Sequence, residues 1–219
     1  TKGAAYVIYC LQQFVGKRRV LTLYSDNAAE VIGSCKEFMM ARDGGQPGVP
    51  HTNGIIERCN QLIIGGTTTC LIAAGFPPCY WSFASPYFCF NLNTLSLHGT
   101  SPWEMTHGAP FAAKTFPFGC LVMFKPNEVR THAQKWSPKA KWGVFAGYKI
   151  VAGYSWRGEY LVWDLVEFQK ADLRTTSNQY KQRAISLPHS SKVLHLPKGE
   201  ITFPSKKDYD RVNTAVLDP

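Results

Sequence analysis

The sequence lacks the patterns that mark membrane proteins and many enzyme classes. No apolar run approaches the ~18 to 20 residues of a membrane-spanning helix, and the N-terminus has no ordered charged, apolar and cleavage regions of a signal peptide. We therefore expect an intracellular protein without a membrane partner. The chain also contains no Gly-rich phosphate loop, no G-x-S-x-G elbow and no H-E-x-x-H motif, so the enzyme classes that depend on these motifs have little support.

Paired cysteines are missing as well. The seven cysteines are an odd number, no two form a C-x-x-C pair, and no pair of histidines stands nearby at zinc-finger spacing. We interpret them as reduced thiols, several of which fill a core. With 219 residues and 45% hydrophobic content, the chain is long enough to bury such a core as one large domain or two small ones.

Acidic residues are scarce in the second half of the chain, which carries most of the net charge of +9. Up to residue 110, seven Lys and Arg residues stand against six acids, whereas the remainder has 17 against nine. The span 113–149 is especially basic, with seven Lys and Arg residues against the single acid Glu128. Such an asymmetry is typical of proteins that contact nucleic acid, and the alternative is a basic surface that serves solubility.

The first half of the chain has an α/β pattern. Helical spacing of apolar residues in AYVIYCLQQFVG (5–16), with a glycine where a C-terminal cap is expected, predicts a helix. The apolar run VLTLY (20–24) predicts a strand covered on both faces. The segment SDNAAEVIGSCKEFMM (25–40) predicts a second helix, and the Gly- and Pro-rich span 41–54 predicts a loop.

A third helix is predicted from residue 55. Its apolar residues fall in one sector of the helical wheel, and Glu57 points away from them. The sector contains Ile55, Ile56, Cys59, Leu62, Ile63 and Cys70. Gly65 and Gly66 weaken this helix by about 1 kcal/mol each, and the sequence gives no reason for them. A turn, an aromatic-rich helix and a short helix are predicted next, within GFPPCYWSFASPYFCFNL (75–92) and HGTSPWEMTHG (98–108).

Beyond about residue 115 the pattern changes to short β-rich runs. The segments FGCLVMFK (118–125), KWGVFAGYK (141–149) and GEYLVWDLVEF (158–168) predict the strands of a small antiparallel barrel. After about residue 171 the chain is polar and contains spaced prolines. This composition predicts an irregular tail that wraps the domains or stays mobile.

Aromatic residues are interleaved with the lysines of the basic span. They are Trp136, Trp142, Phe145 and Tyr148. A basic surface with exposed aromatic rings can follow a phosphate backbone and stack on bases. The alternative is that the rings fill the core of the barrel, which we expect for Phe145 and Tyr148.

Two carboxylates stand in places that suit a metal site. Asp26 stands just after the predicted strand 20–24, separated from it by Ser25, and Glu57 lies on the polar face of a later helix. Divalent cations such as Mg²⁺ prefer hard oxygen ligands of this kind. The pattern alone leaves an alternative, in which Asp26 starts a helix and Glu57 is a solvated surface residue.

Seven motifs, in order, carry a resemblance to a known family. They are YSDNAAE, PGVPHTNGIIERCNQ, AGFPPCYWSFASPYFCFNLNTL, GTSPWEMTHG, FPFGCLVMFKP, WSPKAKWGVFAGY and GEYLVWD. In this order they resemble the integrase of copia-type retrotransposon polyproteins, over about residues 4 to 170. The resemblance implies a ribonuclease H-like catalytic core, whose Asp, Asp and Glu bind two Mg²⁺ ions for DNA strand transfer. A small Src-homology-3-like (SH3-like) barrel follows that core in the family.

The fold class that we expect is therefore α/β followed by all-β. The resemblance implies a partial ribonuclease H-like integrase core over 1–112, an SH3-like β-barrel over 113–170 and a polar C-terminal tail over 171–219. It also implies a nuclear location and contact with a DNA or RNA backbone. Self-association is a further expectation.

The site residues follow from matching each position to the family. Asp26 in SDN matches the second aspartate and Glu57 in NGIIER matches the glutamate, so both are expected to be catalytic and to bind Mg²⁺ or Mn²⁺. Nucleic-acid binding is expected from residues around this glutamate and from lysines of the basic span. These residues are Asn53, Arg58, Lys125, Lys135, Lys139 and Lys141.

The first aspartate of the family has no counterpart in this chain, and the segment between Asp26 and Glu57 is shorter than in the family. A two-metal mechanism needs a carboxylate shared by both ions, so we expect an integrase fragment that performs no strand transfer alone. The short segment also predicts the loss of an edge strand before the loop. Two alternatives stay open: a non-catalytic nucleic-acid-binding remnant, and a protein-interaction module that uses an exposed aromatic stretch over 80–90.

Overall fold

The computed structural model describes residues 3–25, 27–37, 41–44, 54–96, 99–126, 136, 138–169 and 187–214. The chain forms two compact units. Unit 1 comprises Thr1–Leu62 and Ile150–Arg157, and unit 2 comprises Ile63–Lys149 and Gly158–Pro219. The domain boundary predicted at 112/113 lies inside unit 2 and stays a prediction.

The first helix of unit 1, α1 (Ala4–Val15), confirms the first predicted helix. It ends at Gly16, whose φ of 64° favours glycine, and the Gly16 N–H donates to the Gln12 carbonyl at 2.8 Å. A side chain at Gly16 would collide with Gly153, because the Gly153 Cα lies 2.5 Å from the position of an added Cβ. The Gly153 N–H donates to the Gln13 carbonyl at 2.8 Å, which ties a later turn of the chain to α1.

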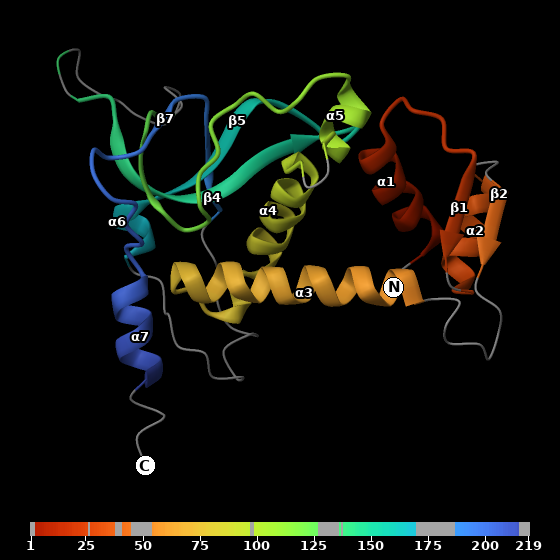
Figure 1. Ribbon diagram of the computed structural model, residues 1–219, viewed down its shortest axis with the longest axis horizontal. Coiled ribbons are helices and arrows are strands. Elements are labelled where there is room, and N and C mark those ends of the chain that lie inside the picture. Colours follow the sequence, from red (N-terminus) through yellow and green to blue (C-terminus); the bar gives the residue numbers. More distant parts are fainter. Residues whose placement is uncertain are drawn as a thin grey trace. The chain divides into compact units, whose positions relative to one another are not determined.

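Unit 1 also contains a β-α-β element (Figure 1). Its parts are β1 (Thr22–Ser25), α2 (Ala29–Glu37) and β2 (Ala41–Gly44), and the two strands pair in parallel. The prediction of a loop over the whole span 41–54 is wrong for β2, and so is the predicted loss of an edge strand before the loop. The residues of β2, ARDG, have low β-propensity, and pairing with β1 decides their structure instead.

The burial of β1 also differs from its prediction. The sequence predicts a strand covered on both faces, but Leu21 and Tyr24 are 68% and 41% exposed. In the described part of unit 1 the sheet has two strands. A sheet of two parallel strands is too narrow to bury the side chains on both of its faces. The apolar run therefore predicts the strand correctly but overestimates its burial.

The structure confirms the helices predicted after the loop, which are α3 (Gly54–Ala74), α4 (Trp81–Thr94) and α5 (Pro102–His107). The turn predicted before α4 contains a short 3-10 helix, η2 (Pro78–Tyr80). Burial of α3 is confined to its C-terminal half. Leu71 and Ala74 are buried, whereas Ile55 and Leu62 are 80% and 50% exposed, so the apolar sector predicted for this helix is not buried over its first half. No helix in the described ranges has the length and apolarity needed to span a membrane.

The two neighbouring glycines of α3 have different surroundings. An added Cβ at Gly66 would lie 2.1 Å from the ring of Phe88 on α4, whereas nothing lies within 4 Å of an added Cβ at Gly65. Gly66 is therefore required for the close approach of α4 to α3, a reason that the sequence alone does not reveal.

A curled five-stranded antiparallel sheet forms a half-barrel, and it belongs to unit 2 except at the turn between β4 and β5 (Figure 1). Its strands are β3 (Leu121–Phe124), β4 (Lys141–Val151), β5 (Ser155–Asp164), β6 (His189–Ser191) and β7 (Leu194–His195). Their order in the sheet is β6-β5-β4-β3-β7. The three β-rich runs of the sequence thus form strands of one antiparallel sheet, as predicted, in a chain of mixed α/β class.

The last of those runs, GEYLVWDLVEF, is not a strand throughout. Its end forms the short helix α6 (Leu165–Phe168). Asp164 ends β5 and caps this helix, because its Oδ1 accepts the Val166 N–H at 3.0 Å. The aspartate turns the chain out of the sheet, and the apolar residues after it continue as a helix.

The tail predicted to be irregular from residue 171 contains two strands and a helix in its described part, 187–214. This part supplies both edge strands of the sheet, with β6 beside β5 and β7 beside β3, and then forms α7 (Lys206–Thr214). The Ser191 Oγ on β6 donates to the Lys125 carbonyl at 2.8 Å. Main-chain pairing needs no apolar side chains, so a polar segment can wrap the sheet in this way.

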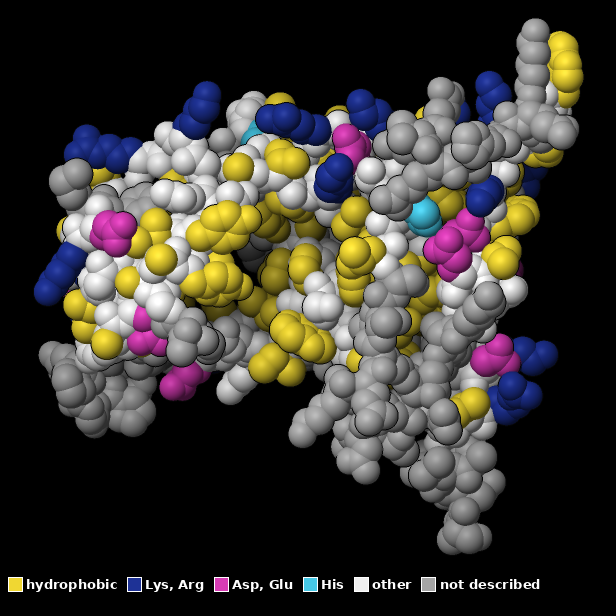
Figure 2. Space-filling model, turned by 180° about the vertical axis from the view of Figure 1, so that it is seen from behind, with side chains coloured by type: hydrophobic (Ala, Val, Ile, Leu, Met, Phe, Trp, Pro, Cys, Tyr) yellow, Lys and Arg dark blue, Asp and Glu magenta, His cyan; other side chains and the backbone are white. Residues whose placement is uncertain are grey.

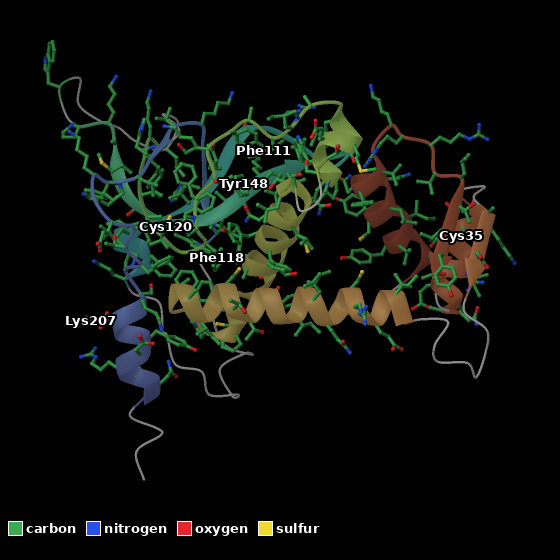
Figure 3. All side chains as sticks on the ribbon, viewed as in Figure 1. Cys35, Phe111, Phe118, Cys120, Tyr148 and Lys207 are labelled. Atoms are coloured by element: carbon green, nitrogen blue, oxygen red, sulfur yellow. The ribbon has the colours of Figure 1, made fainter. Side chains whose placement is uncertain are left out.

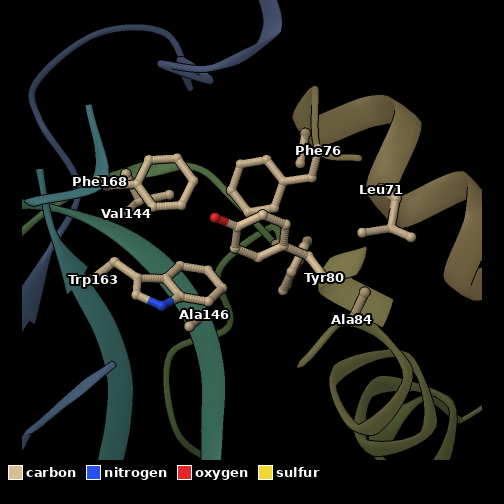
Figure 4. Packing of buried hydrophobic residues seen from close by; sticks show 10 residues of the cluster. Leu71, Phe76, Tyr80, Ala84, Val144, Ala146, Trp163 and Phe168 are labelled. Carbon is tan, nitrogen blue, oxygen red and sulfur yellow. The ribbon is translucent and has the colours of Figure 1, made fainter. Parts of the chain in front are cut away.

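The hydrophobic core of unit 2 joins the sheet to the C-terminal half of α3 and to α4 (Figure 4). Phe76 lies among four other rings, with centroid distances of 5.0 to 5.8 Å. These rings belong to Tyr80, Phe118, Trp163 and Phe168. Because residues on both sides of position 112 share this core, the helices before that position and the strands after it support each other.

Phe145 and Tyr148 are buried, which confirms the prediction that they fill the core. The ring of Tyr148 lies 4.2 Å from that of Phe90 and 5.9 Å from that of Phe111, between centroids. Figure 3 shows Tyr148 on the sheet near Phe111, which lies before β3. Burial raises the pKa of Tyr148 well above its ordinary value.

Candidate nucleic-acid interface

The predicted metal ligands are described only in part. Asp26 lies outside the described residues, as do Asn53 and Lys135. Glu57 lies in the first turn of α3 and is exposed, as is Arg58 beside it. Among the described residues, no three His, Cys, Asp or Glu side chains come together in a group that could hold a metal ion. Because Asp26 is not among the described residues, the expected Mg²⁺ or Mn²⁺ site at Asp26 and Glu57 stays a prediction.

Arg42, on β2, binds the residues on both sides of Asp26. Its Nε donates to the Ser25 Oγ at 3.1 Å, and its Nη2 donates to the Asn27 Oδ1 at 2.6 Å. The guanidinium thus ties the end of β1 and the residues before α2 to β2. It also places a positive charge at the carboxyl end of β1, which opposes the binding of a cation there. Sequence reasoning missed Arg42 because it lies in the span predicted to be loop.

The lysines of the basic span are not equivalent. The Lys141 Nζ lies 3.0 Å from the Asp164 Oδ2, and the Lys149 Nζ lies 2.6 Å from the Glu159 Oε2. The hydrogen bond from Lys149 lowers the pKa of the Glu159 carboxyl. Two of the positive charges counted in the sequence are therefore compensated within the fold.

The remaining described lysines leave a basic surface on the sheet. Lys139 is exposed and makes no ion pair with the described residues. Lys125, at the end of β3, is half-buried. Figure 2 shows Lys and Arg side chains over the five-stranded sheet, at the upper right of that view, with acidic side chains beside some of them. The lysines that are not paired with these acids can attract a phosphate backbone.

The aromatic residues of the basic span divide into two groups. Phe145 and Tyr148 are buried in the core, whereas Trp136 and Trp142 are 90% and 45% exposed. Trp142 is the second residue of β4 and lies opposite Met123 in the antiparallel register. The two exposed indoles flank Lys139 along the chain, so the segment that enters β4 presents both charge and aromatic surface.

An open hollow of about 510 Å³ lies beside Trp142. It is lined by Lys141, Trp142, Asp164, Leu165, Val166, Glu167 and Gln169. Glu167 is 57% exposed, and its Oε2 lies 3.5 Å from the Nε2 of His189 on β6. Sequence reasoning missed this hollow because it forms only when the start of β4 and α6 come together. An aspartate before an apolar run, as in DLVEF, is the signal that could have indicated the helix start.

The cysteines form no catalytic pair within the described ranges. Cys35 and Cys120 are 3% and 0% exposed, which confirms that several cysteines fill a core. Burial raises the pKa of the Cys120 thiol to about 12, so it stays protonated at neutral pH and is a poor nucleophile. The exposed thiols are those of Cys10 and Cys59.

The aromatic stretch 80–90 is not an exposed surface, contrary to one of the alternatives above. Tyr80 and Phe90 are 5% and 1% exposed, and Phe83 packs on Trp163 with 5.1 Å between ring centroids. Trp81, at 61% exposure, is the exception. One side of α4 therefore packs in the core, so the stretch is not the continuous exposed aromatic surface that was expected, and the protein-interaction alternative itself stays untested.

No protein-family model matches this chain, and no curated protein matches it. The resemblance to copia-type integrases therefore depends on the seven motifs in the sequence, and its functional implications are proposals.

Proposed function

We propose that this chain is a nucleic-acid-binding protein of the copia-type integrase family, and that its sheet binds the phosphate backbone of DNA or RNA. The observation that carries the proposal is the arrangement at the start of β4. Lys139 is exposed there, and Trp136 and Trp142 expose their indoles on either side of it along the chain. Lysines bind phosphates with release of counterions, and exposed aromatic rings stack on bases.

The arrangement of the elements supports this proposal. A β-α-β element followed by a five-stranded antiparallel half-barrel suits a partial ribonuclease H-like core followed by an SH3-like barrel. Both of these finer assignments are part of the proposal, and so is a nuclear location, where an integrase would meet DNA. Self-association stays a prediction.

The activity that we propose is binding without strand transfer. The mechanism of the family needs carboxylates that clamp two metal ions. Glu57 is exposed at the start of α3, and the Arg42 guanidinium contacts the two residues that flank Asp26. A guanidinium in this place favours an anion over a cation.

The test is fluorescence anisotropy of a labelled DNA duplex across a salt series. We expect the logarithm of the affinity to fall linearly with the logarithm of the salt concentration. The double variant Lys125→Ala/Lys139→Ala should bind more weakly, and its slope should be shallower by about 0.9 for each phosphate contact that is lost. The matched control is Lys36→Ala/Lys207→Ala, which removes two exposed lysines on the helices α2 and α7.

Lys207 is on α7, as Figure 3 shows, so the control loses the same charge outside the proposed surface. An unchanged slope in the control and a shallower one in the Lys125/Lys139 variant would place the contacts on the sheet. Absence of binding, or binding that does not depend on salt, would contradict the proposal.

A further inference from the structure

We propose that the hollow beside Trp142 receives an unpaired base of a single-stranded nucleic acid, which stacks on the indole ring. This inference rests on the proposed function, because the phosphates on either side of the base need the neighbouring lysines. It goes further in naming single strands as the preferred ligand and Trp142 as the residue that selects them.

The exposure of Trp142 follows from its place in the sheet. Side chains alternate along a strand, so Trp142 is on the same face as Val144 and Ala146. Those two residues are buried in the core with the helices, whereas Trp142 is 45% exposed. The helical cover of this face therefore ends before Trp142, and the indole borders the hollow instead of the core.

The rest of the hollow is formed by α6 and by the residue after it. Phe168 turns into the core and is 4% exposed, while Val166 faces outward at 68% exposure. Leu165 and Val166 give the hollow an apolar side. Its volume of about 510 Å³ is within the range of about 300–1,000 Å³ that is usual for small-molecule sites.

Polar groups stand at the rim of this apolar surface. The two carboxylate oxygens of Asp164 are already engaged, by Lys141 and by the Val166 N–H. Glu167 and Gln169 are both exposed and line the hollow. A base has a flat apolar face and an edge of donors and acceptors, and stacking on a ring with hydrogen bonds at the edge is how proteins read unpaired bases.

The exposed lysine just before β4 favours a nucleic acid over a basic peptide. A lysine or arginine side chain could also lie on the Trp142 ring near Glu167. The charge of Lys141 is compensated by Asp164, but Lys139, three residues before Trp142, makes no ion pair with the described residues and would repel such a cation while attracting a phosphate. Bases in a duplex are stacked on each other, so only an unpaired base can enter the hollow.

The test compares binding of a labelled single strand with binding of a duplex of the same length, at one salt concentration. We expect Trp142→Ala to weaken binding of the single strand about tenfold and to leave duplex binding within about twofold, since a base stacked on an aromatic side chain contributes roughly five- to 150-fold in affinity. Trp142→Phe should retain most of the affinity. The control is Trp81→Ala, which removes another exposed indole from outside the hollow.

A second variant guards against loss of folding in Trp142→Ala. Val166→Glu keeps the indole and places a negative charge in the hollow, and it should weaken single-strand binding more than Ile64→Glu, which adds the same charge at an exposed aliphatic residue of α3. Equal weakening by the two variants would overturn the inference. Wild-type affinity of the Trp142→Ala variant for single strands would also overturn it. The same holds if a Lys- and Arg-rich peptide displaces the single strand from the wild type and the binding of this peptide depends on Trp142. If the wild type binds neither single strand nor duplex, the proposed function itself fails.

Discussion

The ammonium of Lys141, at the start of β4, lies 3.0 Å from the Oδ2 of Asp164, at the end of β5. The lysine side chain is 49% exposed and that of the aspartate 9%. The other oxygen of Asp164 caps α6. One carboxylate thus joins two strands and a helix, and the ion pair compensates its charge where water reaches it poorly.

The first prediction separates this lysine from its neighbour. Lys141→Ala should lower the free energy of unfolding by about 1–2 kcal/mol, because it leaves a nearly buried carboxylate without its cation while solvent screens the exposed side of the pair. Lys139→Ala should change stability little and reduce DNA affinity instead. Urea unfolding followed by circular dichroism, together with DNA titration, measures both quantities. Equal effects of the two substitutions on either quantity would show that the ion pair does not distinguish them.

The second prediction concerns the adjacent glycines of α3. Gly65→Ala should stabilise the protein by about 0.5–1 kcal/mol, because its added Cβ meets nothing within 4 Å and alanine favours the helix. Gly66→Ala should destabilise it by about 1–3 kcal/mol, because the Cβ would lie 2.1 Å from the Phe88 ring. Thermal unfolding of the two variants gives opposite shifts if α3 and α4 pack as described. If the Phe88→Ala background removes the penalty of Gly66→Ala, the clash is its cause.

These glycines illustrate which features the sequence could predict. Helical spacing predicts α3 because amphipathic periodicity is a local property, and it also predicts α1 and α4. Position 66 needs a glycine because the Phe88 ring, 22 residues later in the sequence, packs against it. Only the packing of α3 against α4 reveals this contact. Local patterns find elements, whereas contacts between distant residues depend on the fold.

The same limit applies to the sheet and to the candidate interface. The runs of β3, β4 and β5 are apolar and were predictable. The edge strands β6 and β7 have only three and two residues, too few for a recognisable pattern, and they depend on pairing with β5 and β3. Exposed lysines near β4 were predictable from charge. The ion pair of Lys141 was not, because Asp164 is 23 residues away in the sequence.

The third prediction tests Arg42. Arg42→Ala should increase amide hydrogen exchange in 22–25 and 41–44, because it removes the hydrogen bonds from the guanidinium to Ser25 and Asn27. At this partly exposed site the two bonds together contribute about 1–2 kcal/mol. Arg42→Lys should restore little, since an ammonium cannot reproduce the planar fork. Lys36→Ala, on the exposed side of α2, serves as the charge-matched control. Exchange that rises equally in the control would mean that charge alone matters.

The fourth prediction concerns divalent metal ions. With Arg42 bound at the residues that flank Asp26, and Glu57 exposed, we expect Mn²⁺ to bind weakly, with an affinity that Glu57→Gln changes less than twofold. Calorimetric titration with Mn²⁺ measures this affinity, and a strand-joining assay with Mg²⁺ or Mn²⁺ should detect no product. Metal-dependent joining that disappears in Glu57→Gln would establish the catalytic role that the family resemblance implies and refute this prediction.

The fifth prediction is a loss of stability at alkaline pH. Burial raises the pKa of Cys120 from 9.0 to about 12 and that of Tyr87 from 10.0 to about 12, so both groups are protonated in the folded state at a pH where the unfolded chain ionises them. The unfolded state then binds fewer protons than the folded state, and the free energy of unfolding falls as the pH rises. This stabilisation is complete below about pH 9 and is lost progressively up to about pH 12.

Each tenfold preference for the protonated form is worth about 1.4 kcal/mol, so the two groups together should account for several kcal/mol over this pH window. Urea unfolding across the window measures the decline. Cys120→Ala removes one of the two groups, so its stability should decline less steeply than that of the wild type, even if the variant is less stable at neutral pH because of the cavity. Cys59→Ala, which removes an exposed thiol, should follow the wild type. Parallel declines in the wild type and Cys120→Ala would mean that the Cys120 thiol is not held protonated by burial, and the alkaline loss would then have to come from other groups.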